Sequence, residues 1–181
     1  MGIQLADGGY DFTIFDRGDD FGGTWRKNTY PGAACDVPSH FYSYSFALNP
    51  RWSKTFADQP EILAYIQKVV DDHGLGEHLA PRSGITTLRW SDADQRWTLA
   101  TADGHTREFD IVVSAVGMLD VPNIPDIPGA NRFRGRAFHS SNWDHSKSTA
   151  GERVASIGTG ASAVQYVPAI AAETEHLTVF Q

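Results

Sequence analysis

The sequence predicts an α/β fold, and three observations near its C-terminal end carry that prediction. A predicted strand at 153–157 leads into a glycine-containing turn, the turn opens a predicted helix at 161–172, and a second predicted strand follows at 177–180. Strand, glycine turn, helix and strand in this order form a βαβ unit with parallel strands. The almost wholly apolar run 109–113 is predicted to be a strand buried on both faces of a parallel sheet.

The N-terminal part alternates short regular elements with one long irregular stretch. We expect residues 1–5 to be the end of a helix and residues 12–15 to be a strand that ends in Asp16. Segment 18–39 is rich in Gly, Pro and Asp, and it is predicted to be a loop. Loops of this length in compact domains usually carry function.

The clearest predicted helix covers residues 61–72. Ile62, Ile66 and Val69 recur at helical spacing and share one face, and Gly74 can end the helix.

Residues 85–90 and 97–101 predict two strands joined by a turn at 91–94. Residues 121–128 carry three prolines and are expected to be a stiff, extended linker.

Composition excludes several classes of function. The chain is 41% hydrophobic and 20% charged, which is typical of a protein that forms a core. Its net charge of −7 argues against nucleic acid as the main partner. No apolar run is long enough to span a bilayer and no signal peptide is evident, so no membrane partner and a cytoplasmic location are expected. Cys35 is the only cysteine and the histidines lack ligand spacing, so no metal site is expected.

The turn Gly158-Thr159-Gly160 follows a predicted strand and opens a predicted helix that also contains Ser162 and Ala163. This context makes a G-x-G-x-x-A pattern a dinucleotide-binding candidate. The first glycine permits the tight turn, the second lets a pyrophosphate approach the backbone, and the third position needs only a small residue. An ordinary strand-to-helix turn is the alternative.

A second candidate site lies at the end of the first predicted strand. Asp16 stands where a dinucleotide fold places an acid that binds a ribose hydroxyl, although an Asp there is usually a turn residue. Gly22 and Gly23 offer backbone amides that can face a phosphate or a ring system, and Thr24-Trp25 place an aromatic wall beside them.

The segment from Phe133 to Asp144 spells F-x-G-x-x-x-H-x-x-x-W-D, with His139 and Trp143 at the named positions. With Gly22-Gly23 and the later glycine turn, this pattern resembles the Baeyer–Villiger monooxygenases, a branch of the class B flavin-containing monooxygenases. The resemblance runs essentially from one end of the chain to the other.

The resemblance implies a flavoprotein with two dinucleotide-binding, Rossmann-like domains, both incomplete here. Residues 1–117 would be a partial FAD-binding domain, 118–150 a linker with the motif, and 151–181 the start of the NADP-binding unit. No G-x-G-x-x-G precedes Phe12. The family's catalytic arginine and its 2′-phosphate reader would lie beyond Gln181, so the chain is expected to be a fragment truncated at both ends.

The resemblance also assigns roles to individual residues. Catalytic roles fall to Asp36, His139 and Trp143. FAD-contacting roles fall to Asp16, Gly22, Gly23, Thr24, Trp25, Asp36, Tyr42 and Ile85, with Gln59 close to the flavin. NADPH-contacting roles fall to Gly158, Thr159, Gly160 and Ser162. Core packing remains an open alternative for Tyr42 and Trp143, and a satisfied loop histidine for His139.

The implied activity is FAD- and NADPH-dependent oxygenation of a ketone to an ester or lactone, with O₂ as co-substrate and a C4a-peroxyflavin as the oxygenating species. Residues 1–181 alone are expected to be inactive. One alternative is an N- or S-oxygenating flavin-containing monooxygenase acting on a heteroatom substrate, which Trp143-Asp144 disfavours, since relatives of that type have an aromatic residue followed by Lys. The other alternative is a non-catalytic nucleotide-binding fragment. The sequence leaves the substrate and the oligomeric state open.

Overall fold

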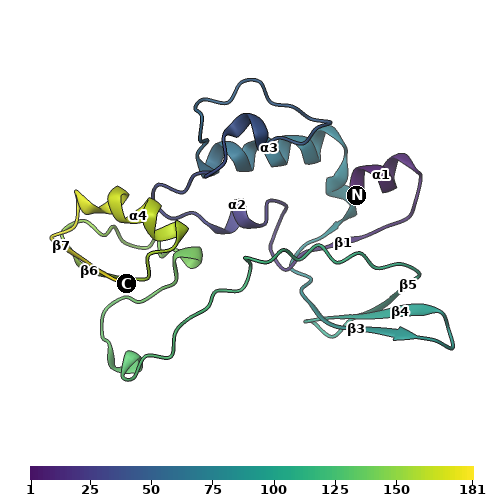
Figure 1. Cartoon of the computed structure of the whole chain (residues 1–181). Helices are drawn as coiled ribbons and strands as arrows, with labels where there is room; N and C mark the ends of the chain where they lie inside the picture. Colours follow the sequence, from purple (N-terminus) through teal and green to yellow (C-terminus); the bar gives the residue numbers. More distant parts are fainter. The chain divides into compact units, whose positions relative to one another are not determined.

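The computed structural model describes all residues, 1–181, as a mixed α/β structure (Figure 1). The chain divides into two compact units, and helix α3 (Gln59–Asp72) contributes residues to both. Unit 1 comprises residues 1–23 and 66–118, and unit 2 comprises residues 24–65 and 119–181.

Unit 1 begins with the predicted N-terminal helix and strand. Its first elements are α1 (Gly2–Asp7), β1 (Ile14–Phe15), η2 (Leu75–His78) and β2 (Leu79–Ala80). Strand β1 pairs in parallel with β2, with Ile14 opposite Leu79. Gly74 takes a left-handed conformation with φ of 61° just after α3 ends, which confirms its expected place at the end of that helix. Short β2 and η2 were not predicted from the sequence.

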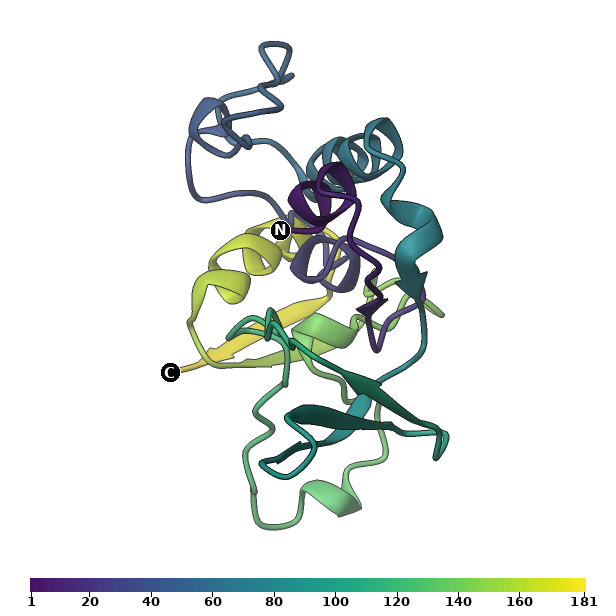
Figure 2. The ribbon, with the colours of Figure 1, turned by 90° about the vertical axis from the view of Figure 1, so that its right-hand side faces the viewer.

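A three-stranded antiparallel sheet forms the rest of unit 1. Its strands are β3 (Ile85–Ser91), β4 (Arg96–Thr101) and β5 (Thr106–Phe109), in the order β3-β4-β5, drawn as teal arrows in Figure 2. The predicted hairpin between the first two strands is confirmed. Leu99 and Thr101, two positions apart on the central strand β4, are buried and therefore lie on one face of the sheet.

The prediction of a buried strand over 109–113 is wrong. Strand β5 ends at Phe109, and Ile111 and Val113 are 79% and 56% exposed and lie outside any strand. An apolar run becomes a buried parallel strand only when neighbouring strands pair with it and helices cover it. No strand of the chain pairs with residues 111–113.

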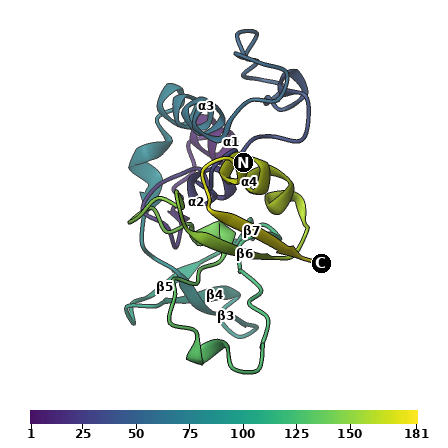
Figure 3. The ribbon, with the colours of Figure 1, turned by 90° about the vertical axis from the view of Figure 1, so that its left-hand side faces the viewer.

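Unit 2 contains the βαβ unit that the sequence predicts. Strand β6 (Arg153–Ile157) pairs in parallel with β7 (His176–Phe180), and α4 (Ala161–Ala171) lies along one face of the pair (Figures 1 and 3). Ala163 and Ile170 are the buried residues of this helix. The strand–helix–strand prediction is therefore confirmed, with shifts of one residue at the end of the helix and at the start of β7.

The remaining elements of unit 2 are short. They are α2 (Thr24–Lys27), η1 (Ser39–Phe41), η3 (Ala130–Arg132) and η4 (Ser140–Asn142). Helix α2 falls inside the stretch 18–39 that was predicted to be a loop throughout. A single turn of helix is too short to leave a periodic pattern in the sequence.

Ser39 holds the irregular segment before α3 in place. Its side chain is 1% exposed, and its hydroxyl lies 2.9 and 3.0 Å from the carbonyl oxygens of Thr55 and Lys54. The same hydroxyl oxygen accepts a hydrogen bond of 2.8 Å from the backbone N–H of Ala57, which is fully buried. One side chain thus satisfies backbone groups that water cannot reach.

We expect Ser39→Ala to lower the free energy of unfolding by about 2 kcal/mol, because it leaves the buried N–H of Ala57 without an acceptor. Urea denaturation of the variant and of Ser45→Ala, which removes an exposed hydroxyl, measures the difference. Equal stability of the two variants would show that the segment finds other partners.

Candidate functional site

The glycine turn before α4 has the geometry of an anion site. Gly158 has a φ of +100°, which favours glycine, and its N–H donates to the carbonyl of Phe180 at 2.8 Å. Gly160 precedes the helix with an ordinary φ of −69°, and a Cβ placed on it would meet no atom within 4 Å. The first N–H groups of α4 have no partner within the helix and carry partial positive charge. The space before the turn is therefore a candidate site for a phosphate group.

The other nucleotide candidates on this turn lie beside it. Thr159 is exposed, and Ser162, in the first turn of α4, is half-buried. Ala163, at the third position of the pattern, is 7% exposed and packs into the interior, as the small-residue requirement predicts.

Unit 1 holds four of the predicted flavin-site residues. Asp16 directly follows β1, and its Oδ1 accepts a hydrogen bond of 2.6 Å from the N–H of Gly18, so its carboxylate shapes the turn that follows the strand. Gly22 and Gly23 have φ values of 128° and 49°, and a Cβ on Gly23 would meet no atom within 4 Å. Ile85 is exposed at the first position of β3. The turn role of Asp16 is thus real, and it leaves the ribose role a prediction.

Unit 2 brings three further candidates together. The indole N–H of Trp25 donates to the hydroxyl of Tyr42 at 2.9 Å, and the two rings meet edge to face with centroids 5.6 Å apart. The side-chain amide of Gln59 donates to the backbone carbonyl of Trp25. Thr24, the first residue of α2, is exposed next to them.

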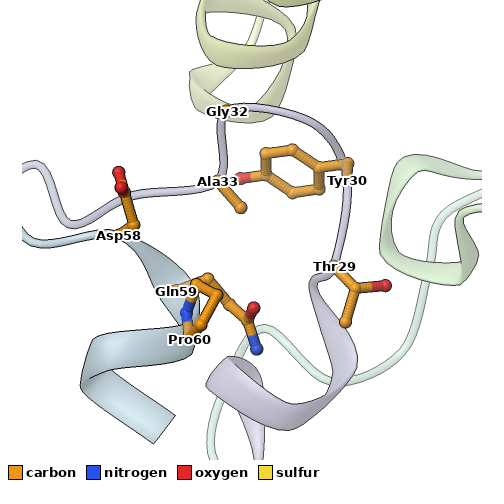
Figure 4. Close-up of a pocket in the computed structure, with 7 residues that line it drawn as sticks. All are labelled: Thr29, Tyr30, Gly32, Ala33, Asp58, Gln59 and Pro60. Atoms are coloured by element: carbon orange, nitrogen blue, oxygen red, sulfur yellow. The ribbon is translucent and has the colours of Figure 1, made fainter.

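A pocket of about 300 Å³ opens beside this cluster (Figure 4). It lies between the loop that follows α2 and the start of α3. Its walls are Thr29, Tyr30, Gly32, Ala33, Asp58, Gln59 and Pro60. Figure 4 shows the amide of Gln59 directed into the space between the two segments. Of the residues given a place near the flavin from the sequence, only Gln59 lines it.

Asp36 lies outside the lining of that pocket. Its side chain is exposed and makes no hydrogen bond within the chain. The neighbouring Cys35 is 3% exposed, and burial raises the pKa of its thiol, so it remains a protonated, packed side chain and not a nucleophile.

His139 has a fixed tautomer. Its Nδ1 accepts a hydrogen bond of 3.1 Å from the backbone N–H of Ser141 and lies 2.9 Å from the Ser141 hydroxyl. A backbone N–H can only donate, so Nδ1 is the acceptor and the neutral ring carries its proton on Nε2. The second half of the motif thus presents an Nε2–H donor.

Trp143 packs the motif against helix α4, which follows the glycine turn. The centroid of its ring lies 5.1 Å from the ring centroid of Phe138 and 5.3 Å from that of Tyr166 on α4. The hydroxyl of Tyr166 in turn lies 2.7 Å from that of Ser156 on β6. The motif and the βαβ unit therefore form one packed body within unit 2, and this contact is compatible with both the packing role and the hinge role.

Arg136 braces the motif, and sequence reasoning did not single it out. Its guanidinium contacts Glu152 at 2.8 Å and Asp144 at 3.3 Å, and it donates to the carbonyls of Lys147 and Ser148 at 3.1 Å each. The pKa of Arg136 is raised chiefly by its hydrogen bond with Glu152. Hydrogen bonds from Ser146, and then the guanidinium of Arg136, lower the pKa of Asp144.

The structure shows no group of three or more His, Cys, Asp or Glu side chains placed to hold a metal ion. None of the helices combines the length and the hydrophobicity that crossing a bilayer requires.

Comparison with known proteins places the chain in a family. The family model described as flavin-binding monooxygenase-like matches residues 4–179. The chain belongs to this family. The resemblance that the glycine pairs and the 133–144 motif indicate is thereby confirmed.

Individual relatives of this flavin-binding monooxygenase-like chain sharpen the comparison. It is 51% identical over 171 residues to a Baeyer–Villiger monooxygenase of Streptomyces coelicolor, covering 94% of the chain and 33% of that protein. It is 40% identical over 177 residues to a phenazine N-monooxygenase of Lysobacter antibioticus, covering 96% of the chain and 33% of that protein. The chain spans about a third of the length of these curated relatives.

A solved structure matches nearly the whole chain. Cyclohexanone monooxygenase from Rhodococcus sp. Phi1 bound to NADP⁺ superimposes with a TM-score of 0.92 at 38% identity, covering 99% of this chain and 34% of that one. The arrangement of helices and strands is therefore that of the corresponding third of this enzyme.

Proposed function

We propose that the chain forms part of a Baeyer–Villiger-type flavoprotein monooxygenase with two Rossmann-like nucleotide-binding domains. In this proposal residues 1–117 belong to the FAD-binding domain, 118–150 to the linker and 151–181 to the NADP-binding domain. One observation carries it. The F-x-G-x-x-x-H-x-x-x-W-D motif packs through Trp143 and Tyr166 onto the helix that the Gly158–Gly160 turn opens. This ring contact joins the family motif to the helix whose first turn is the candidate nucleotide site.

The proposed cofactor contacts follow from the geometry of each part. The α4 N-terminus, with Gly158, Thr159, Gly160 and Ser162, would hold the pyrophosphate of NADPH. For FAD, Asp16 would bind the ribose, and Gly22 and Gly23 would offer backbone amides. The flavin-contacting residues would further include Thr24, Trp25, Tyr42 and Ile85. Bound FAD would supply the chemistry, accepting a hydride from NADPH and using O₂ to convert a ketone to an ester or lactone.

The chain's own side chains would orient neighbouring groups and donate hydrogen bonds to the nucleotide. The Nε2–H of His139 is turned away from Ser141 and would donate a hydrogen bond to a nucleotide acceptor. Trp143 would transmit movement of the motif to α4, since its ring lies against Tyr166. The carboxylate of Asp36 has no partner within the chain and would orient a cationic group close to the flavin.

A chimera tests the proposal. Residues 4–179 replace the matching segment of the Streptomyces coelicolor Baeyer–Villiger monooxygenase, to which the chain is 51% identical. We expect the chimera to bind FAD and to convert a ketone that the parent enzyme oxidises, with NADPH consumption coupled to ester formation. A folded, FAD-containing chimera that consumes no NADPH in the presence of ketone would refute the function.

The same chimera tests the role of His139. We expect His139→Ala to lower NADPH-dependent oxygenation by about 100-fold, on the order of the loss that misplaced reactants cause, while the melting temperature stays within about 2 °C of the unmodified chimera. His105→Ala, at a histidine 83% exposed in the loop between β4 and β5, is the matched control. Activity and stability that fall in step would favour the packing role.

N-oxygenation is a second candidate, because the chain is 40% identical to the phenazine N-monooxygenase over the 177 residues that align. Product analysis decides between the two. A chimera that oxidises an aromatic amine or phenazine nitrogen, and leaves the ketone unchanged, would assign the chain to the N-oxygenating type.

A further inference from the structure

Helix α4 and the loop 30–34 are joined by the side chain of Gln165. Its Oε1 accepts hydrogen bonds from the Tyr30 hydroxyl at 2.9 Å and from the backbone N–H of Ala34 at 3.3 Å. Its Nε2 donates to the backbone carbonyl of Ala34 at 2.9 Å. One side chain thus satisfies both backbone groups of Ala34.

This contact completes a short ladder. On one side of the loop, the N–H of Cys35 donates to the carbonyl of Ala57 at 2.9 Å, and the N–H of Gln59 donates to the carbonyl of Ala33 at 2.8 Å. Ala34 lies between these bonds, in the middle of an antiparallel bridge with Asp58, and its own N–H and C=O point the other way. The primary amide of Gln165 pairs with them as a peptide group of a further strand would.

Gly32 brings the loop close enough for this pairing. Its φ is +78°, and a Cβ on it would lie 2.9 Å from the backbone oxygen of Gln165 and 3.2 Å from the Cβ of Ala169. Figure 4 shows Gly32 directly beneath α4, at the top of the pocket. Gln165 is hydrogen-bonded to Tyr30 and Ala34. These two residues flank Gly32 and Ala33, which line the pocket.

We propose that Gln165 is a positioning residue, which fixes the loop wall of the pocket from the helix whose first turn forms the candidate nucleotide site. Five positions after Gly160, Gln165 lies just over one helical turn from that site. A ligand that orders the first turn of α4 therefore also orders the loop wall of the pocket, because Gln165 connects the two. The importance of this link for oxygenation rests on the proposed function, whereas the positioning itself does not.

The test uses amide hydrogen exchange of Ala34 in residues 1–181 without any cofactor. Gln165→Met keeps the length and flexibility of the side chain but removes its hydrogen-bonding atoms. We expect the protection of the Ala34 amide to fall by about tenfold at every pH. Gln4→Glu, on the exposed face of α1, is the control that changes a helical glutamine elsewhere.

Gln165→Glu provides a pH signature that a merely structural role would not give. A protonated carboxyl accepts from Tyr30 and Ala34 and donates to the Ala34 carbonyl, as the amide does, whereas the ionised form cannot donate. Among the titratable groups near this position, Tyr30 contacts Gln165, Tyr166 packs against the Tyr30 ring, and Asp58 pairs with Ala34 across the bridge and with Lys54 at 2.6 Å. Because this position is half-buried, we expect the pKa of a glutamate here to lie above its usual value of about 4.3.

The direction of the effect follows from that raised pKa. Protection in Gln165→Glu should match the unmodified chain below about pH 4 and fall by about tenfold as the pH rises toward 7. Recovery at acidic pH also shows that the variant folds. Unchanged protection in Gln165→Met, or pH-independent protection in Gln165→Glu, would overturn the proposal. An inactive chimera with the expected exchange pattern would count against the proposed function alone.

Discussion

Gly160→Val in the chimera should raise the KM for NADPH by at least about 100-fold while the FAD content stays the same. The reason is steric and local. The φ of Gly160 is −69°, which valine adopts without strain, and a Cβ there meets no atom of the chain within 4 Å. The valine therefore costs the folded chain little and fills the space in which a pyrophosphate would contact the backbone. Steady-state kinetics with NADPH, together with the flavin absorbance of the purified protein, measure both quantities.

Gly76→Val is the matched control, since a Cβ at Gly76 also meets nothing within 4 Å and its φ needs no glycine. Gly76→Val should change neither the KM for NADPH nor the FAD content. If Gly160→Val weakens the binding of FAD and NADPH equally, or weakens the binding of neither, the turn before α4 is not the NADPH site.

Purified residues 1–181 should lose all bound FAD on desalting, which is the second large effect. The proposed flavin residues include Asp16, Gly22 and Gly23, but no G-x-G-x-x-G turn precedes Phe12 in these residues. A flavin dinucleotide gains much of its binding from backbone amides at such a turn and the helix that follows it. Ordering the loop from 18 to 39 around the ligand would cost much of what the remaining contacts contribute.

The measurement is the visible spectrum after incubation with excess FAD and desalting, with the FAD-saturated chimera as the positive control. A colourless protein is expected. A yellow protein with about one flavin per chain would contradict the prediction, and it would also remove the reason to regard residues 1–181 alone as inactive.

Elements with a repeating pattern could be predicted from the sequence. Helix α3 shows apolar residues at helical spacing, and the βαβ unit has a glycine turn directly after its first strand, so both were found within two residues of their ends. The run 109–113 was misassigned because hydrophobicity indicates that a segment prefers burial, and only a pairing partner makes it a strand. Short α2 has no period to detect.

Some residues of the candidate site could likewise be predicted from the sequence, and others could not. The glycine turn and the pairing of Trp25 with Tyr42 involve residues that the sequence singled out, although their cofactor roles remain predictions. Arg136 and Gln165 were missed because their partners are backbone groups and side chains distant in sequence. A signal was present for Gln165, the only long, non-aromatic polar side chain in helix α4.

The contact between Gln165 and Ala34 constrains how related sequences can change in length. A single residue inserted between Gly160 and Gln165 would turn the glutamine about 100° around the helix and move it about 1.5 Å along it, away from the loop. The loop has little room to move with the glutamine, because a Cβ on Gly32 would already lie 2.9 Å from the backbone oxygen of Gln165. Insertions and deletions should therefore be absent between these two positions wherever both the turn and the glutamine occur. The five-position interval between the turn and the amide becomes a criterion for recognising, in other sequences, chains that fasten this loop in the same manner.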